Sequence, residues 1–205
     1  MIDKMKTSKV GEKKARTHAL ILDTAAKAIC RGGYSGISVT DLMKEAGLTH
    51  GGFYAHFSSR DAMSTEAMTL AADNSRARIA PIMQQHQRHG MSPFRSLVES
   101  YLSEQHLVAI EQGCPIAALA SEIVRQADEV RTASVIQLEN LRQAIAQTLP
   151  HLTDSATPNA ILSTLVGGLQ LARALGDNKA GKALLKDCRD TLLTQYDLVG
   201  QNLAP

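Results

Sequence analysis

The sequence of 205 residues predicts an all-α protein. Aromatic residues make up only 3% of the chain and Trp is absent, whereas strands favour aromatic and β-branched residues. Hydrophobic residues account for 44% of the chain, and many recur at intervals of three and four positions, the spacing of one helix face. A chain of this size can bury the core of one medium domain, or of a small domain joined to a larger one.

Charge is unevenly distributed, although the formal net charge is only +2. Residues 1–60 contain ten Lys and Arg against five acids, and residues 61–205 contain twelve against fifteen. A basic N-terminal module suits a polyanionic partner, and the alternative is a solvated Lys-rich tail. Residues 1–15 are polar and Lys-rich, so we expect a disordered basic arm there.

The first predicted helix covers residues 16–31. Ile21, Ala25 and Ile29 recur at helical spacing, and two glycines at positions 32 and 33 end the pattern.

Two short helices joined by a tight turn are expected next. Ser38-Val-Thr-Asp41 is a capping box, in which each side chain satisfies a free amide at a helix start. Gly47 can adopt the left-handed conformation that ends this helix, and Thr49 can cap the following one. This arrangement is typical of a helix-turn-helix, whose second helix enters the DNA major groove. A second box, Ser58-Ser-Arg-Asp61, opens a fourth helix.

Beyond the fourth helix the apolar spacing stays helical and no strand pattern occurs. Predicted helices cover residues 94–112, 115–125, 128–149, 158–175 and 180–199.

The segment Leu48-Thr-His-Gly-Gly-Phe-Tyr-Ala-His-Phe57 is the most informative in the chain. Gly51 and Gly52 should each cost roughly 1 kcal/mol relative to Ala inside a helix. Two such residues make sense where the backbone must approach a partner closely, and the free amides at a helix N-terminus bind phosphate. Four nearby side chains can donate hydrogen bonds: Thr49, His50, Tyr54 and His56.

These motifs carry a resemblance to a known family. The segment from Arg16 to Met63, with its capping box, its Gly-Gly-Phe-Tyr-x-His-Phe run and the Ser-Arg-Asp-Ala-Met that follows, resembles the DNA-binding domain of TetR-family bacterial repressors. The resemblance covers about a quarter of the chain. Residues 113–119, Gly-Cys-Pro-Ile-Ala-Ala-Leu, are similar to one branch of the family.

The resemblance implies a helix-turn-helix domain over residues 16–62 and a helical effector-binding and dimerisation domain over residues 63–205. The implied function is that of a cytoplasmic repressor that binds a pseudo-palindromic operator in double-stranded DNA as a homodimer and is released by a small-molecule effector.

DNA contacts can be carried over position by position. The resemblance implies base contacts from Thr40, Thr49 and His50 and a phosphate contact from the Tyr54 hydroxyl. It places His56 and Arg60 near the DNA backbone, and it leaves only backbone amides for contacts at Gly51 and Gly52, because position 52 lacks the Thr of many members. The alternative for Tyr54 and His56 is packing under neighbouring helices.

The dimer interface is expected in the last two long helices, through which family members dimerise. One stripe at helical spacing suits this role, and the alternative is that it belongs to the internal core. Its members are Ile161, Leu165, Gly168, Leu169 and Ala172.

The effector cavity is expected near Tyr101, His106 and Cys114. The alternative for His106, which the sequence favours, is a satisfied core or surface histidine. Cys114 precedes a Pro at a helix start, where free amides would favour its thiolate, so we advance the hypothesis that it senses an electrophile or oxidant. The alternative is a buried capping residue.

Several classes of protein and site are not indicated. The chain has no Gly-rich phosphate loop, HExxH or GxSxG motif and no paired carboxylates at catalytic spacing, so we expect no enzyme. Three widely spaced cysteines give no disulfide framework or zinc motif, and we expect no cofactor and no metal. No apolar run reaches the roughly 20 residues that span a membrane. The remaining competitor is a helical module that carries a small ligand without touching DNA.

Overall fold

The structure is a computed structural model that describes residues 2–36, 38–149, 154 and 156–197. These residues form helices and contain no strand, which confirms the all-α prediction. The elements are α1 (Ile2–Gly32), α2 (Val39–Glu45), the 3-10 helix η1 (His50–Ala55), α3 (Arg60–Arg88), α4 (Pro93–Tyr101), α5 (Glu104–Val108), α6 (Pro115–Ile123), α7 (Asp128–Ala146), α8 (Thr157–Leu175) and α9 (Lys179–Tyr196).

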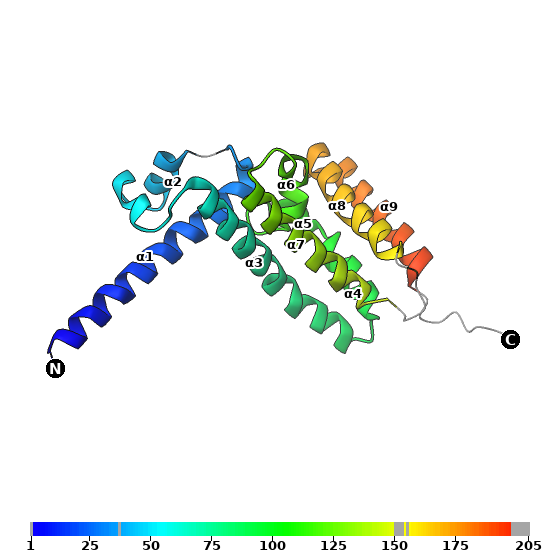
Figure 1. The fold of residues 1–205 in the computed structure, drawn as a ribbon. Coiled ribbons are helices and arrows are strands. Elements are labelled where there is room, and N and C mark those ends of the chain that lie inside the picture. Colours follow the sequence, from blue (N-terminus) through cyan, green and yellow to red (C-terminus); the bar gives the residue numbers. More distant parts are fainter. Residues whose placement is uncertain (1, 37, 150–153, 155, 198–205) are drawn as a thin grey trace.

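The helices form an N-terminal helix-turn-helix domain and a larger C-terminal bundle (Figure 1). α1, α2 and η1 lie at one end of the molecule, and α8 and α9 lie side by side at the other. α3 packs on α1 at its beginning and on α4 and α7 further along, so it belongs to both parts. None of the described helices combines the length and the apolar character needed to cross a bilayer.

Local signals place the helix-turn-helix as predicted. The Ser38 hydroxyl accepts a hydrogen bond from the Asp41 amide at 3.1 Å, and the Ser59 hydroxyl accepts one from the Ala62 amide at 2.9 Å. Gly47 has a φ of 70°, the left-handed conformation expected for the end of α2. The Ser38 cap and the turn are therefore confirmed, whereas the fourth helix is capped by Ser59, one residue later than the predicted box that starts at Ser58.

The second helix of the motif is shorter than expected. The sequence predicts a helix of about nine residues, and the structure has the six-residue 3-10 helix η1, whose Thr49 cap makes no side-chain hydrogen bond. Two adjacent glycines explain a helix this short. Phe53 and Phe57 hold it in place, because they are 0% and 3% exposed and their rings lie 5.5 Å apart.

Two elements differ from the prediction. The structure begins α1 at Ile2, where we expected a disordered arm over residues 1–15. This segment is rich in Lys, a good helix former.

The single helix predicted over residues 94–112 is two helices in the structure. The Ser103 hydroxyl accepts a hydrogen bond from the His106 amide at 3.1 Å and starts α5.

The stripe predicted as the dimer interface lies inside the protomer. Its four larger members are 0% exposed: Ile161, Leu165, Leu169 and Ala172. A Cβ added to Gly168 would lie 3.0 Å from the Cys188 Sγ of α9. Residues without exposed surface in one chain cannot bury surface against a second, so this assignment is wrong and the alternative, internal core, is correct.

Candidate nucleic-acid interface and cavity

The helix-turn-helix presents its predicted contact residues on the outside. Thr40 on α2 is exposed, as are Thr49, His50 and Gly51 at the start of η1. Tyr54 is 65% exposed, and its ring packs edge-on against the buried Phe53 at 5.2 Å. Packing on Phe53 fixes the ring and leaves the hydroxyl end at the surface, so the packing alternative does not describe Tyr54.

Glycine at position 51 has no explanation inside the protein. A Cβ added there would meet nothing within 4 Å, and its φ is not positive. At Gly52 the nearest atom would be the Met43 methyl at 3.6 Å, an ordinary contact. No contact within the described chain therefore compensates for the helix propensity lost at these two glycines. Their presence favours close approach of an external partner to the backbone.

His56 is half-buried and packs against α1. Its Nδ1 is buried without a hydrogen-bond partner, and its ring centre lies 6.0 Å from that of His18. Burial, followed by the nearby His18 and Lys14, lowers the pKa of His56 below its usual value, so the ring is neutral at pH 7. Positive charge on this surface therefore comes from lysines of α1, not from His56.

Arg60 stands at the start of α3 with an exposed side chain. Its guanidinium donates a hydrogen bond to the Tyr34 carbonyl. Arg60 therefore ties α3 to the turn after α1, and its surface position also suits a DNA phosphate.

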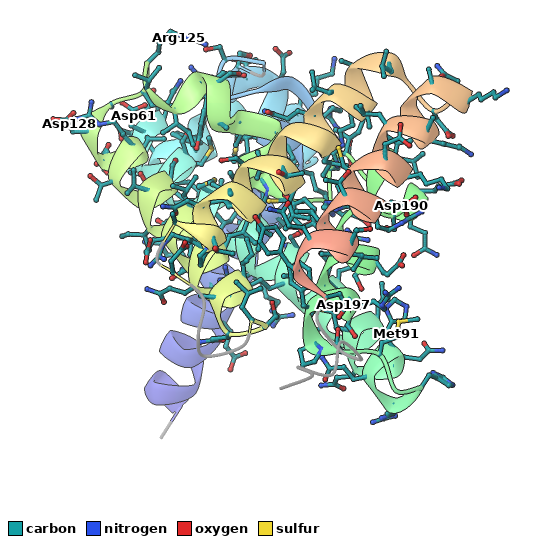
Figure 2. The ribbon with its side chains drawn as sticks, turned by 90° about the vertical axis from the view of Figure 1, so that its right-hand side faces the viewer. Asp61, Met91, Arg125, Asp128, Asp190 and Asp197 are labelled. Atoms are coloured by element: carbon teal, nitrogen blue, oxygen red, sulfur yellow. The ribbon has the colours of Figure 1, made fainter. Side chains whose placement is uncertain are left out.

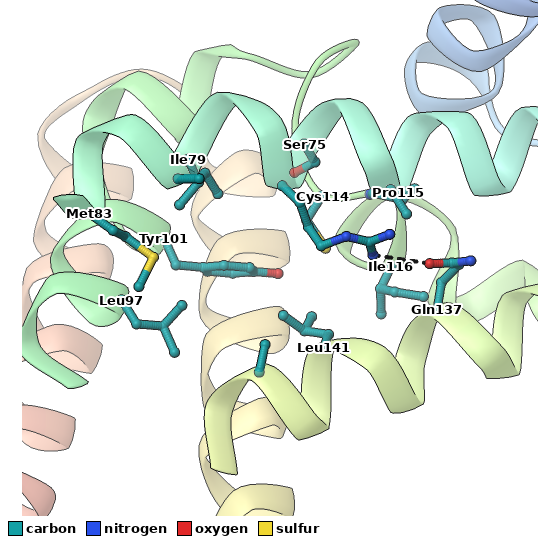
Figure 3. Close-up of a pocket in the computed structure, with 14 residues that line it drawn as sticks. Ser75, Ile79, Met83, Leu97, Tyr101, Cys114, Pro115, Ile116, Gln137 and Leu141 are labelled. Atoms are coloured by element: carbon teal, nitrogen blue, oxygen red, sulfur yellow. Dashed lines mark hydrogen bonds between the residues drawn. The ribbon is translucent and has the colours of Figure 1, made fainter. Parts of the chain in front are cut away.

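A cavity of about 220 Å³ lies between α3, α4, α6 and α7 (Figure 3). Of the three residues expected near an effector cavity, Tyr101 and Cys114 line this cavity and His106 does not. Apolar side chains form most of the wall, and the larger ones are Ile79, Met83, Leu97, Ile116 and Leu141.

The Tyr101 side chain points into this cavity (Figure 3). The residue is only 2% exposed, and its hydroxyl makes no hydrogen bond of normal geometry among the described residues, although the Cys114 thiol, a weak acceptor, lies beside it. Burial raises the pKa of Tyr101 well above its ordinary value. The hydroxyl is therefore protonated and can donate a hydrogen bond.

His106 lies behind the cavity wall and connects two of the residues that line it, Tyr101 and Cys114. Its Nδ1 donates to the Tyr101 carbonyl at 2.7 Å, and its Nε2 accepts from the Cys114 amide at 2.9 Å. Burial lowers the pKa of His106 to about 3, so the ring is neutral. His106 is therefore the satisfied core histidine that the sequence offered as the alternative to a cavity position.

Cys114 occupies the N-cap position of α6 and is 6% exposed. Its side chain makes no hydrogen bond to the first amides of the helix. The sensing hypothesis for this thiol stays a prediction. Among the described residues no group of three or more His, Cys, Asp or Glu is placed to hold a metal ion.

Two polar contacts join the helix-turn-helix to the cavity region. The Glu122 carboxylate of α6 accepts a hydrogen bond from the Tyr34 amide at 3.0 Å. The Tyr34 hydroxyl lies 2.9 Å from the Ser134 hydroxyl of α7.

Arg31 adds an ion-pair link between the same two parts. It pairs with Glu45 of α2 at 2.8 Å and with Glu111, in the loop before α6, at 2.6 Å. No local sequence pattern could predict these pairs, since their members lie far apart in the chain.

Comparison with known proteins gives consistent matches. Residues 21–67 match the family model described as bacterial regulatory proteins, tetR family. A relative from Lactococcus lactis, described as an uncharacterized HTH-type transcriptional regulator in the lacX 3' region, is 27% identical and aligns over 90% of this chain and 95% of its own.

Solved structures match along most of the chain. A TetR transcriptional regulator from Chloroflexus aurantiacus has a TM-score of 0.70 at 20% identity, covering 90% of this chain and 97% of its own. A TetR-family regulator from Agrobacterium tumefaciens has a TM-score of 0.69 at 23% identity, covering 89% and 98%. At these identities the structures establish the fold, and the family model identifies the DNA-binding segment.

Proposed function

Because this chain belongs to the TetR family of transcriptional regulators, we propose that it represses transcription by binding an operator as a homodimer and that a small molecule releases it. The observation that carries the proposal is the exposed surface from Thr49 to Tyr54, with a glycine at position 51 that packing inside the protein does not require.

One copy of this surface is too small for specific binding. η1 has six residues, so it can reach only a few base pairs. Two copies on a pseudo-palindrome, with half-site centres roughly 34–36 Å apart, supply the remaining contacts. The basic residues of the N-terminal part add salt-dependent attraction to phosphates.

The outer face of α8 supports the dimer. Leu171 and Leu175 are 60% and 48% exposed, although large apolar side chains normally avoid water. The same face carries Ser163, Gly167 and Ala174, whose small side chains allow a second helix to approach closely. Figure 2 looks onto this side of the molecule, where α8 and α9 lie in front.

The position of the cavity supports release by a small molecule. α3 lines the cavity with residues 72–83 and begins at Arg60 beside η1. α6 lines it with Pro115 and Ile116 and contacts Tyr34 through Glu122. A molecule that fits the cavity in only one arrangement of these helices shifts the dimer toward that arrangement, and with it the spacing of the two DNA-binding surfaces.

A mobility-shift experiment with DNA from upstream of the protein's own gene tests the proposal. The wild type should retard this DNA, with an affinity that falls steeply as salt rises.

Tyr54→Phe should weaken binding to every sequence alike, by about 1 kcal/mol per protomer, because it removes one phosphate contact. His50→Ala should relax the preference at one base pair.

Tyr196→Phe is the matched control, because Tyr196 lies on α9, and it should bind DNA like the wild type. Failure of the wild type to retard any fragment would overturn the proposal. Ligand binding without DNA binding would favour the helical carrier instead.

A further inference from the structure

The cavity indicates what kind of molecule it accepts. Resting on the function proposed above, we propose that it binds an uncharged, mainly apolar molecule of about one ring, whose single polar oxygen accepts a hydrogen bond from the Tyr101 hydroxyl.

The Tyr101 hydroxyl is a donor for which the described chain offers no stronger acceptor than the Cys114 thiol beside it. The hydroxyl is buried without a hydrogen bond of normal geometry and points into the cavity. The Tyr101 ring is held in place, since it packs edge-on against the His106 ring at 4.9 Å and the Tyr101 backbone carbonyl accepts a hydrogen bond from the His106 Nδ1. Buried hydroxyls are costly without a partner, so a ligand oxygen at this point gains a bond that the free protein lacks.

The charge of the wall argues against an ionised ligand. Arg76 is the one charged residue among the described side chains that line the cavity, and its side chain is 48% exposed. It already pairs with Asp73 and donates a hydrogen bond to the side-chain amide oxygen of Gln137 at 3.1 Å. A carboxylate beside Tyr101 would lose its hydration without gaining an unpaired cation.

The volume of the cavity sets the size of the ligand. A cavity of about 150 Å³ lined by apolar side chains is known to hold benzene. At about 220 Å³ this one has room for a ring with a short substituent. Ala72, Ala80 and Ala144 line it, and larger side chains at these positions would reduce this space.

Acetophenone, ethylbenzene and benzoate form a matched set of probes. Acetophenone and ethylbenzene have similar shapes, and only the first has a carbonyl oxygen, whereas benzoate carries a charge. Titration calorimetry on the full chain without DNA should give a dissociation constant for acetophenone roughly tenfold below that for ethylbenzene. Benzoate should bind more weakly than either.

Tyr101→Phe should remove the preference for acetophenone and leave ethylbenzene binding unchanged. Tyr34→Phe is the matched control, because this second buried tyrosine already pairs with Ser134 and does not line the cavity, and it should keep the preference. Ala144→Phe retains Tyr101 but fills the cavity, so it should weaken both neutral probes by about tenfold or more.

Equal affinity of the wild type for acetophenone and ethylbenzene would overturn the inference, as would tighter binding of benzoate, no binding of any probe, or a preference that survives Tyr101→Phe. These outcomes are independent of DNA. A protein that retards its operator but fails here keeps the proposed DNA-binding role, and one that shows the tyrosine-dependent preference without binding DNA keeps the ligand site.

Discussion

At the scale of single residues, His106 shows how burial and hydrogen bonding fix one protonation state. A carbonyl can only accept, so the Nδ1 that faces the Tyr101 carbonyl carries the proton. The Nε2 that faces the Cys114 amide must then be an acceptor. Burial, followed by the positive charges of Arg173 and Arg78, lowers the pKa from 6.5 to about 3, and a second proton would also break the bond to the Cys114 amide.

Replacing His106 should therefore change how stability depends on pH. Between pH 6.5 and about 3 the unfolded chain binds a proton at this residue and the folded chain does not, so stability falls as the pH is lowered. The expected contribution is a loss of about 2 kcal/mol between pH 6.5 and 5. His106→Gln can keep both hydrogen bonds through its amide group and does not titrate. Urea unfolding at several pH values should show a smaller acid loss for this variant.

The control is His89→Gln, the same substitution at a histidine that is exposed and not buried. It should lose stability in acid as the wild type does. If His106→Gln and the wild type show the same slope between pH 6.5 and 5, His106 does not titrate with a depressed pKa.

At the scale of helices, α6 connects the cavity to the DNA-binding part. Its first residues, Pro115 and Ile116, line the cavity. Two turns later Glu122 accepts a hydrogen bond from the Tyr34 amide. Gly33 has a φ of 80°, and a Cβ there would lie 2.3 Å from this carboxylate, so the turn fits closely around it.

Removing this contact should separate ligand binding from DNA release. In Glu122→Ala, a molecule that releases the wild type from its operator should bind with nearly unchanged affinity. Its effect on operator affinity should shrink about fivefold, because a coupling free energy of typical size loses one half-buried hydrogen bond. Operator titrations with and without the molecule measure this difference.

Glu129→Ala, at an exposed glutamate of α7, is the control and should respond like the wild type. Full release of Glu122→Ala at the concentrations that release the wild type would show that the Tyr34 contact carries no coupling.

The helices that the sequence predicted well are those whose ends carry local signals. Ser38, Ser59 and Gly47 act within four residues of their own positions, so the pattern alone was sufficient. The break between α4 and α5 was missed, because the capping Ser103 lies within a run with continuous helical spacing. The short η1 also escaped prediction, since helix propensity does not specify the 3-10 geometry.

At the scale of the whole molecule, the two faces of α8 explain why the predicted dimer interface is wrong and where we propose it instead. Its inner stripe, with Leu165 and Leu169 at 0% exposure, packs against the protomer. The opposite face, with Gly167 and Leu171, remains open. Helical spacing identifies an apolar stripe but does not say which surface covers it. Tyr101 and Cys114 line the cavity near which the sequence placed them, whereas His106 is held behind its wall by the Tyr101 carbonyl and the Cys114 amide, five and eight residues away.

Gly167→Arg should prevent dimerisation without disturbing the fold. A Cβ at this position would meet nothing within 4 Å, so the side chain would extend from the outer face of α8 into the proposed interface. Size-exclusion chromatography with light scattering should give a monomer with a wild-type circular dichroism spectrum, and operator binding should fall by at least about tenfold. By contrast, an arginine at position 168 would collide with Cys188 and test only the core.

Ala77→Arg is the matched control, because Ala77 is also exposed but lies on α3. This variant should remain dimeric. A dimer of Gly167→Arg with wild-type operator affinity would show that the chains meet through another surface.

Three alanines in the cavity wall make the ligand range proposed for it easy to change during evolution. Ala72 and Ala80 lie on α3 and Ala144 on α7, so single substitutions can lengthen a side chain from either side. Each added methylene group removes part of the space while the hydrogen-bond donor of Tyr101 stays in place. Descendants of one ancestral gene could thus come to respond to smaller or differently shaped compounds while reading the same DNA sequence. The same three positions offer a starting library for laboratory selection of a sensor with a chosen response.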